Sequence, residues 1–118
     1  MLNETTYTGV PLPIGIHEAD REWTQIANKL VDTHPLVRRA KDEWNRFVFA
    51  RSNYEKAYKA ARQCSSARYI SPLGEFQYMQ AHKAENREMT ALMQAARLVK
   101  ERIRILKAHP ECFIEEKE

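Results

Sequence analysis

The sequence predicts an all-α fold: a long antiparallel helical hairpin, coiled-coil-like, preceded by one short helix and an extended arm. The 118-residue chain contains only three glycines. Two long segments place apolar residues at steps of three and four, the spacing of a helix face packed on another helix. Between them stands Ser71-Pro72-Leu73-Gly74, where Ser suits the N-cap and Pro the first helical position. These observations together predict the hairpin.

An extended arm is predicted over residues 1–16, because this segment has no helical period and contains two prolines and two glycines. A short first helix is then predicted over residues 17–33. Acidic residues occupy its first turns, where the helix dipole favours them. One apolar stripe runs along it: Trp23, Ile26, Ala27, Leu30 and Val31.

The second helix is predicted over residues 35–64, with Pro35 as its first residue. Its apolar seam is rich in aromatic residues: Val37, Ala40, Trp44, Phe47, Tyr54, Tyr58 and Ala61. The run Phe47-Val48-Phe49-Ala50 is apolar on more than one face, so a third helix or a second subunit is expected to cover it.

The third helix is predicted over residues 72–108 and is ended by Pro110. Its seam follows a regular 3-4 repeat: Met89, Leu92, Ala96, Val99, Ile103 and Leu106. Residues 17–109 are therefore expected to form one helical domain. Residues 110–118 form an acidic tail, within which Cys112, Phe113 and Ile114 are candidates for a small apolar anchor.

The predicted lengths favour association with a protein. At about 1.5 Å per residue, the two long helices measure roughly 45 and 55 Å, and one short helix cannot cover both. A homo-oligomer or a dedicated protein partner is therefore expected. The candidate interface residues are Trp44, Phe47, Phe49, Tyr54 and Tyr58. Most of them also belong to the predicted seam, which makes Phe49, off that seam, the best interface candidate.

The composition argues against a membrane protein. No segment approaches the roughly 18 consecutive apolar residues of a membrane-spanning helix, so no membrane partner is expected. The first residues lack a basic region followed by an apolar run, and the chain has two cysteines. We therefore expect a cytoplasmic protein with free thiols.

Charge is distributed unevenly along the chain. Residues 36–107 carry 16 Lys or Arg against 7 Asp or Glu, whereas the two flanks together carry 3 against 9. A basic stripe beside aromatic residues is the pattern that binds a phosphate backbone, although a solvated helix face has the same pattern. The candidate nucleic-acid contacts are Arg38, Arg39, Arg46, Arg97, Lys100, Arg104 and Lys107.

The two ends of the hairpin hold the candidate metal ligands and the two cysteines. An antiparallel register brings His34, His109 and Cys112 to the open end, where such ligands suit zinc. Histidines beside helix-ending prolines are more often capping residues, so no metal or other cofactor is expected. Cys64 belongs to the turn end, about 45 Å from Cys112, which excludes a disulfide between them.

Catalysis has little support in the sequence. His82, Glu85 and Glu88 share the spacing of an acid–base pair on a helix, but no phosphate loop, nucleophile elbow or paired metal motif accompanies them. Neither an enzyme nor a small-molecule substrate is expected. The leading hypothesis is a non-enzymatic interaction protein, an adaptor, assembly factor or inhibitor of a larger complex, which self-associates. The alternative is a nucleic-acid-binding module that uses the basic stripe.

Overall fold

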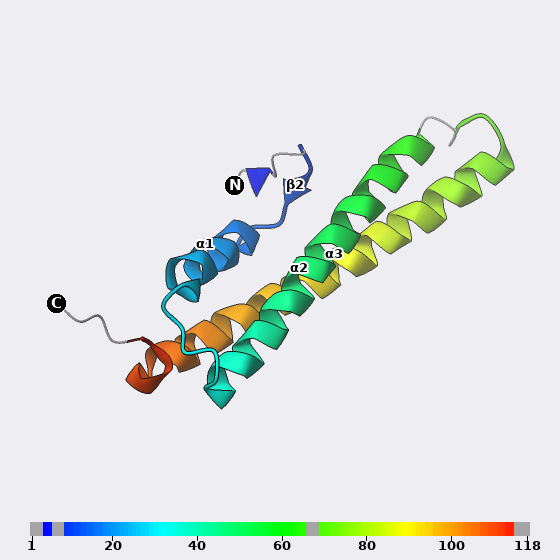
Figure 1. The fold of residues 1–118 in the computed structure, drawn as a ribbon. Coiled ribbons are helices and arrows are strands. Elements are labelled where there is room, and N and C mark those ends of the chain that lie inside the picture. The colour runs from blue at the N-terminus through cyan, green and yellow to red at the C-terminus, as the bar shows by residue number, and fades with distance from the viewer. Residues whose placement is uncertain (1–3, 6–8, 66–68, 115–118) are drawn as a thin grey trace.

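The computed structural model describes residues 4–5, 9–65 and 69–114. The elements follow in the order β1 (Glu4–Thr5), β2 (Pro11–Leu12), α1 (Ile16–Ala27), α2 (Pro35–Ser65), α3 (Pro72–Lys107) and the 3-10 helix η2 (Pro110–Cys112). The helices α2 and α3 form an antiparallel hairpin, and the molecule measures 67 × 25 × 20 Å (Figure 1). The predicted all-α hairpin is confirmed; the two strands are two-residue segments that pair antiparallel.

The bounds of the hairpin agree with the prediction to within one residue. At the start of α3, Ser71 accepts a hydrogen bond from the backbone N–H of Gly74 at 3.0 Å, which satisfies a free amide of the first turn. At the start of α2, the ring nitrogen Nδ1 of His34 accepts one from the N–H of Leu36 at 3.1 Å. Both capping residues precede a proline. Between α2 and α3, residues 66–68 lie outside the described residues.

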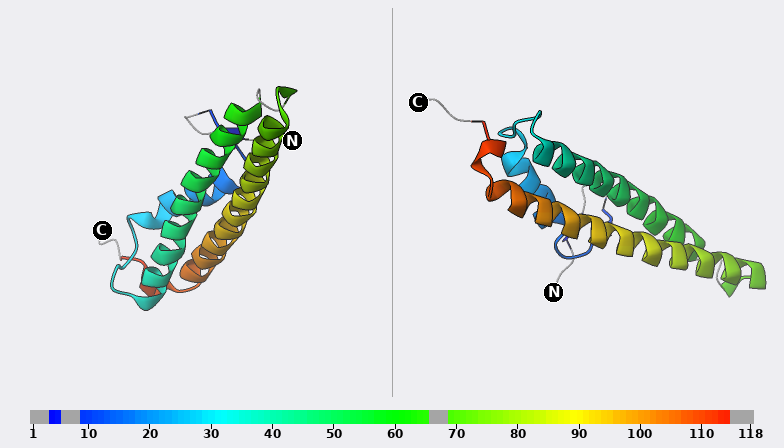
Figure 2. Two further views of the ribbon diagram at one scale, coloured as in Figure 1. Left: turned by 90° about the vertical axis from the view of Figure 1, so that its right-hand side faces the viewer. Right: turned by 90° about the horizontal axis from the view of Figure 1, so that it is seen from below.

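The hydrophobic core occupies the half of the hairpin remote from the turn, which we call the base (residues 35–54 of α2 and 89–107 of α3). The core contains Val37, Ala40, Phe47 and Tyr54 of α2 and Leu92, Ala96, Val99, Ile103 and Leu106 of α3. The short helix α1 lies across the base and contributes Ile16, Ala19, Trp23 and Ile26 (Figures 1 and 2). Within the run of apolar residues that begins at Phe47, Phe47 itself is buried, whereas Val48 and Phe49 are 38% and 69% exposed, so no described element of this chain covers the second face of the run.

The arm packs on its own hairpin. Val10 and Leu12 are buried in the same core as α1. The hydroxyl of Tyr54 donates a hydrogen bond to the carbonyl oxygen of Pro11 at 3.3 Å. Gly15 then turns the chain into α1 with a φ of 97°, and a Cβ at this position would lie 3.1 Å from Nζ of Lys100. The remainder of the predicted arm, residues 1–3 and 6–8, lies outside the described residues.

The end predicted for the first helix is wrong: α1 ends at Ala27 and not at residue 33. The following backbone pairs with the C-terminal segment, since Val31 N–H donates to the carbonyl of Cys112 at 2.8 Å and Ile114 N–H donates to the carbonyl of Lys29 at 2.7 Å. Leu30 therefore belongs to an extended segment and not to a helix, and its side chain is buried in the core. Of the predicted apolar anchor, Cys112 is buried in the core and Phe113 packs against it, whereas Ile114 is 57% exposed. Residues 115–118 of the predicted acidic tail are outside the described residues.

Beyond Tyr54, the hairpin continues as two helices alone and projects past α1 (Figure 2). We call this half the projection (residues 55–65 of α2 and 72–88 of α3). Its buried residues in the described part are Ala61, Gly74 and Glu85. Two of these three residues, Ala61 and Gly74, are small and allow the helices to approach, so the projection has no group of large buried apolar side chains among its described residues. None of the described helices has the length and apolar character needed to cross a membrane.

Candidate functional site

Large apolar side chains gather at the free end of the projection, where they lie exposed. We call this group the apolar tip: Tyr69, Ile70, Leu73, Phe76 and Met79. Their exposed fractions range from 50% for Met79 to 84% for Tyr69. Eleven consecutive positions thus hold five exposed large apolar residues, whereas scattered single ones are ordinary on a protein surface. An exposed patch of this kind is typical of a binding surface.

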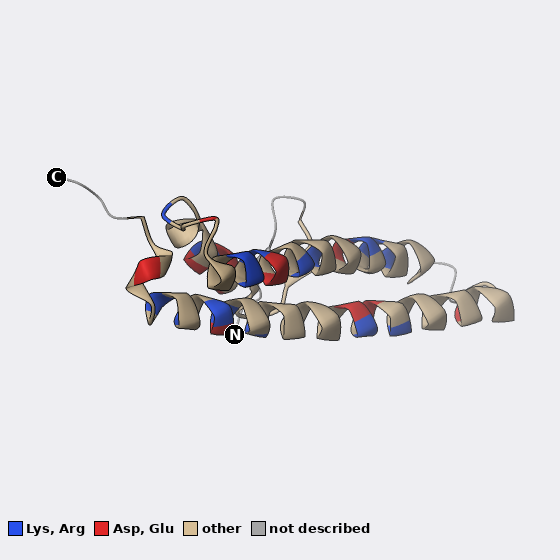
Figure 3. Ribbon diagram, turned by 60° about the horizontal axis from the view of Figure 1, so that its bottom comes forward, with Lys and Arg blue, Asp and Glu red and all other residues tan. Residues whose placement is uncertain are grey.

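The tip is also nearly uncharged. Residues 69–81 contain one charged side chain, Glu75, and Figure 3 shows the beginning of α3 almost free of acidic and basic residues. A shallow depression beside the turn is lined by Tyr69, Ile70, Ser71, Pro72 and Glu75. Its backbone is held by the cap of Ser71 on Gly74, so the apolar side chains are presented from a helix with a defined first turn.

The aromatic residues predicted as the interface are placed differently. Phe47 and Tyr54 are 0% and 4% exposed in the core of the base, so the prediction that they form a protein interface is corrected: α1 and the arm already cover them. Trp44 and Tyr58 are half-buried against the same core. Phe49 alone of the five is open to solvent, with 69% exposure.

The apolar tip does not belong to the helical seam that the sequence pattern predicts. Leu73, Phe76 and Met79 lie off the seam of α3, on the side away from the buried Gly74 and Glu85. The signal that would have found them is composition: apolar and aromatic residues cluster between positions 69 and 79 although this segment surrounds a turn. Turns are ordinarily polar, so this local excess of apolar residues indicates a candidate binding surface.

The predicted basic stripe on α3 faces acidic residues of α1. Nζ of Lys100 lies 3.4 Å from a carboxylate oxygen of Glu18. One depression between the two helices is lined by Glu18, Glu22, Lys100, Ile103, Arg104 and Lys107. Arg97, Arg104 and Lys107 remain exposed, as do Arg38, Arg39 and Arg46 on α2. The cations therefore lie on two helices, and the α3 group is partly neutralised within the chain.

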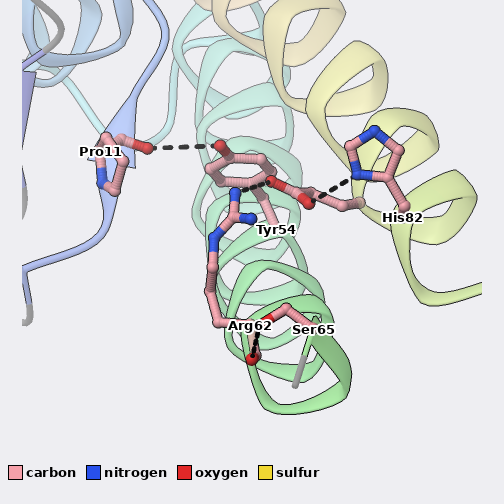
Figure 4. A network of polar contacts seen from close by, with 6 residues as sticks. Pro11, Tyr54, Arg62, Ser65 and His82 are labelled. Carbon is pink, nitrogen blue, oxygen red and sulfur yellow. Dashed lines mark hydrogen bonds and ion pairs between the residues drawn. The ribbon is translucent and has the colours of Figure 1, made fainter. Parts of the chain in front are cut away.

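A buried carboxylate lies where the base meets the projection. Glu85, 7% exposed, has Oε1 3.3 Å from Nη2 of Arg62 and Oε2 3.5 Å from Nδ1 of His82. Figure 4 shows Arg62 and His82 approaching this site, with the Tyr54 hydroxyl directed toward Pro11. Burial, and next the charge of Glu85, raise the pKa of Tyr54.

This arrangement is an internal ion pair. The predicted neighbours His82 and Glu85 do meet, but Arg62 occupies one oxygen of the carboxylate and the ring of His82 stacks on Tyr78 with centroids 6.0 Å apart. Oε2 of Glu85 lacks a hydrogen bond in the described part of the chain. A carboxylate held between two helices in this way is suited to fixing their register.

The candidate metal ligands do not converge as predicted. Sγ of Cys112 lies 3.7 Å from Nδ1 of His34, but the ring of His109 pairs with Glu111 at 3.0 Å. No group of three possible ligands occurs among the described residues. Burial, and then the charge of Glu111, raise the pKa of the Cys112 thiol. Cys64 lies at the opposite end of the hairpin, and both thiols are free, as predicted.

Comparison with models of known protein families, with curated proteins and with solved structures finds no match to this chain.

Proposed function

We propose that this chain is a non-enzymatic protein-interaction protein that contacts its partner through the apolar tip. The base supplies a folded core, and the projection carries the tip away from it. In this role the chain is an adaptor, an assembly factor or an inhibitor acting on a protein complex. The single observation that supports the proposal is the group of five exposed large apolar side chains at the end of the hairpin.

A protein partner suits the tip better than a small molecule does. Its apolar side chains spread over the outer side of α3 and the turn, and the depression between them is shallow. Small-molecule sites are concave and enclose most of the ligand surface, whereas protein interfaces have apolar, aromatic-rich centres with few charges. The tip has two aromatic side chains, Tyr69 and Phe76, and one charge.

The proposal is tested by photo-crosslinking from defined positions. A benzophenone amino acid replaces Phe76 at the tip or, as a matched control, Gln94 on the base. The two positions are 18 residues apart, about five helical turns, so they lie on the same side of α3. We expect protein adducts from position 76 in cells that encode this chain and far fewer from position 94. Equal yields from both positions, or none from position 76, would remove the tip as the contact surface.

Phe49 is a second contact in this proposal. Its ring is exposed on the outer side of α2, but its helical neighbours Asn45, Ser52, Asn53 and Lys56 are polar or charged. An isolated ring contributes less to an interface than one at the centre of an apolar patch. We therefore expect Phe49→Ala to weaken association less than Phe76→Ala does, when both variants are compared by the same binding assay.

Nucleic-acid binding is the second candidate, supported by the six exposed cations of the predicted contact set, three on α2 and three on α3. Fluorescence anisotropy with labelled duplex and single-stranded DNA, at low and at physiological salt, tests it. Binding that weakens steeply with salt and disappears in the variant Lys100→Glu with Arg104→Glu would make the α3 stripe the contact. Absence of binding at low salt would eliminate this candidate and leave the tip.

A further inference from the structure

The outer side of α3 in the projection forms a continuous face. Pro72, Phe76, Met79 and Lys83 follow one another at steps of four, three and four. Glu75 lies three residues after Pro72 and four before Met79, and all five are exposed. Gly74 and Glu85, which are buried against α2, lie on the opposite side of the helix. About three turns of α3 thus present an apolar centre, Phe76 and Met79, between one acidic and one basic residue.

The charges on this face are self-complementary. Glu75 and Lys83 stand four residues to either side of Met79, and neither forms an ion pair within the described part of the chain. If a second copy of this face packs antiparallel about Met79, Glu75 of each copy lies opposite Lys83 of the other. Parallel packing would instead place like charges opposite each other. A symmetric interface requires this reciprocal pairing, in which residue i contacts j and j contacts i.

The shape of the molecule allows such a pairing. With Met79 at the centre, residues 72–86 of the two copies overlap, and both bases point outward. The start of α1 and the residues before it line one depression with α3, in which Ile14 lies beside Met93. They therefore lie beyond the overlap. Both side chains are about half exposed.

The projection also lacks the layer that stabilises the base. The base has three helical layers around large apolar side chains, whereas the projection has two helices that meet through Ala61, Gly74 and Glu85. Pairing of two projections covers the outer face of each α3 with the α3 of the other copy, so that an apolar stripe left open in the single chain is packed on a helix. Phe76 and Met79 of the two copies would then lie between the two α3 helices.

From these observations we infer that the occupant of the apolar tip is a second copy of this chain. Two hairpins pair through the outer faces of α3, antiparallel, with Met79 near the two-fold axis. This inference rests on the proposed function and names its partner. The overlap of about 22 Å along the helix is shorter than that of most permanent dimers, so we expect a dimer that dissociates in the micromolar range.

A charge-exchange series tests the register. Sedimentation velocity is measured from about 1 to about 500 µM, the range that a contact of this size requires. The wild type, Glu75→Lys, Lys83→Glu and the variant with both changes are compared. Each single change places two pairs of like charges in the dimer, and we expect about tenfold weaker association. The double change exchanges the charges, and we expect it to restore the wild-type affinity. Lack of restoration overturns the register, and a wild type that stays monomeric overturns the dimer.

A cysteine on the two-fold axis provides an independent test. In a Cys64→Ser background, Met79→Cys is expected to give a disulfide-linked dimer on mild oxidation, because equivalent residues at the axis approach within bonding distance. Gln94→Cys, outside the overlap, serves as the control. Equal linkage of the two variants overturns the inference. Circular dichroism of each variant verifies that its helices are intact.

These measurements separate the inference from the proposed function. A monomeric wild type whose position 76 still crosslinks to a different protein overturns the second copy as occupant and leaves the interaction function. If the chain is monomeric and position 76 yields no adduct, both are overturned. If position 76 crosslinks to residues 72–86 of another copy, and the charge exchange restores association, the proposed function and the inference are both supported.

Discussion

Trp23 of α1 lies flat against Trp44 of α2, with ring centroids 5.3 Å apart and planes inclined by 11°. The ring of Trp44 in turn contacts Phe47, with centroids 5.2 Å apart. The short helix is thereby connected through two aromatic contacts to the centre of the hairpin seam. Because this connection exists only in the base, α1 stabilises that half and leaves the projection as two helices.

We expect Trp23→Ala to lower the free energy of unfolding by about 3 to 5 kcal/mol, since a ring that is 5% exposed is removed and leaves a cavity. The matched control is Phe49→Ala, an exposed ring on α2, which should change this free energy by no more than about 0.5 kcal/mol. Urea denaturation followed by circular dichroism measures both. Similar losses in the two variants would mean that α1 does not stabilise the base.

The hairpin could be predicted from sequence because its signals are local. Pro35 and Ser71-Pro72 define where α2 and α3 begin, and the apolar period along each helix needs no knowledge of the partner. The end of α1 could not be predicted in this way. Leu30 and Val31 continue the helical period, but their backbone pairs with residues 112–114, which are about 80 positions away in the chain. Contacts at that distance are invisible to a local pattern.

The candidate site shows a different limit. An apolar residue in a helical pattern can face the core or a partner, and the pattern alone does not distinguish the two. Tyr54 and Phe47 proved to be core residues because the arm and α1 cover them. Phe76 and Met79, outside any seam, proved to be exposed. Only the three-dimensional position of α1, which reaches no farther than the base, decides which apolar residues remain uncovered.

The ion pair between Arg62 and Glu85 is expected to contribute to stability. Arg62→Met leaves the Glu85 carboxylate buried without its nearest cation, and we expect a loss of about 1 to 2 kcal/mol, reduced by the partial exposure of Arg62. Lys59→Met removes an exposed cation from the same helix and should have almost no effect. Denaturant unfolding compares the two variants. If Arg62→Met is as stable as Lys59→Met, the pair has no role in holding the helices together.

Stability should fall at alkaline pH. Burial raises the pKa of Cys112 above its ordinary 9.0 and that of Tyr54 above its ordinary 10.0. Above those ordinary values the unfolded chain has lost protons that the folded chain still holds. The free energy of unfolding is therefore highest below about pH 9 and decreases as pH rises through the folded pKa values.

The variant Tyr54→Phe isolates one of these two groups. At neutral pH it should cost about 0.5 to 1.5 kcal/mol, because the hydrogen bond to the carbonyl of Pro11 is lost. Above pH 10 its stability should decline less steeply than that of the wild type. Urea denaturation at a series of pH values measures both slopes. Parallel slopes above pH 10 would show that Tyr54 does not titrate differently in the folded chain.

The two thiols should differ in reactivity, because Cys64 is half-buried near the end of α2 while Cys112 is 0% exposed in the core. In a Cys64→Ser variant, the remaining Cys112 thiol should react with a thiol reagent at least about 100-fold more slowly in the folded chain than in denaturant. The reverse variant, Cys112→Ala, leaves Cys64, which should react readily without denaturant. With a chromogenic disulfide reagent, the absorbance of the thiolate that it releases measures the rate of both reactions. Rapid reaction of Cys112 in the folded chain would mean that the segment after α3 is not docked against Leu30, and that the paired backbone of residues 29–31 is not what ends α1.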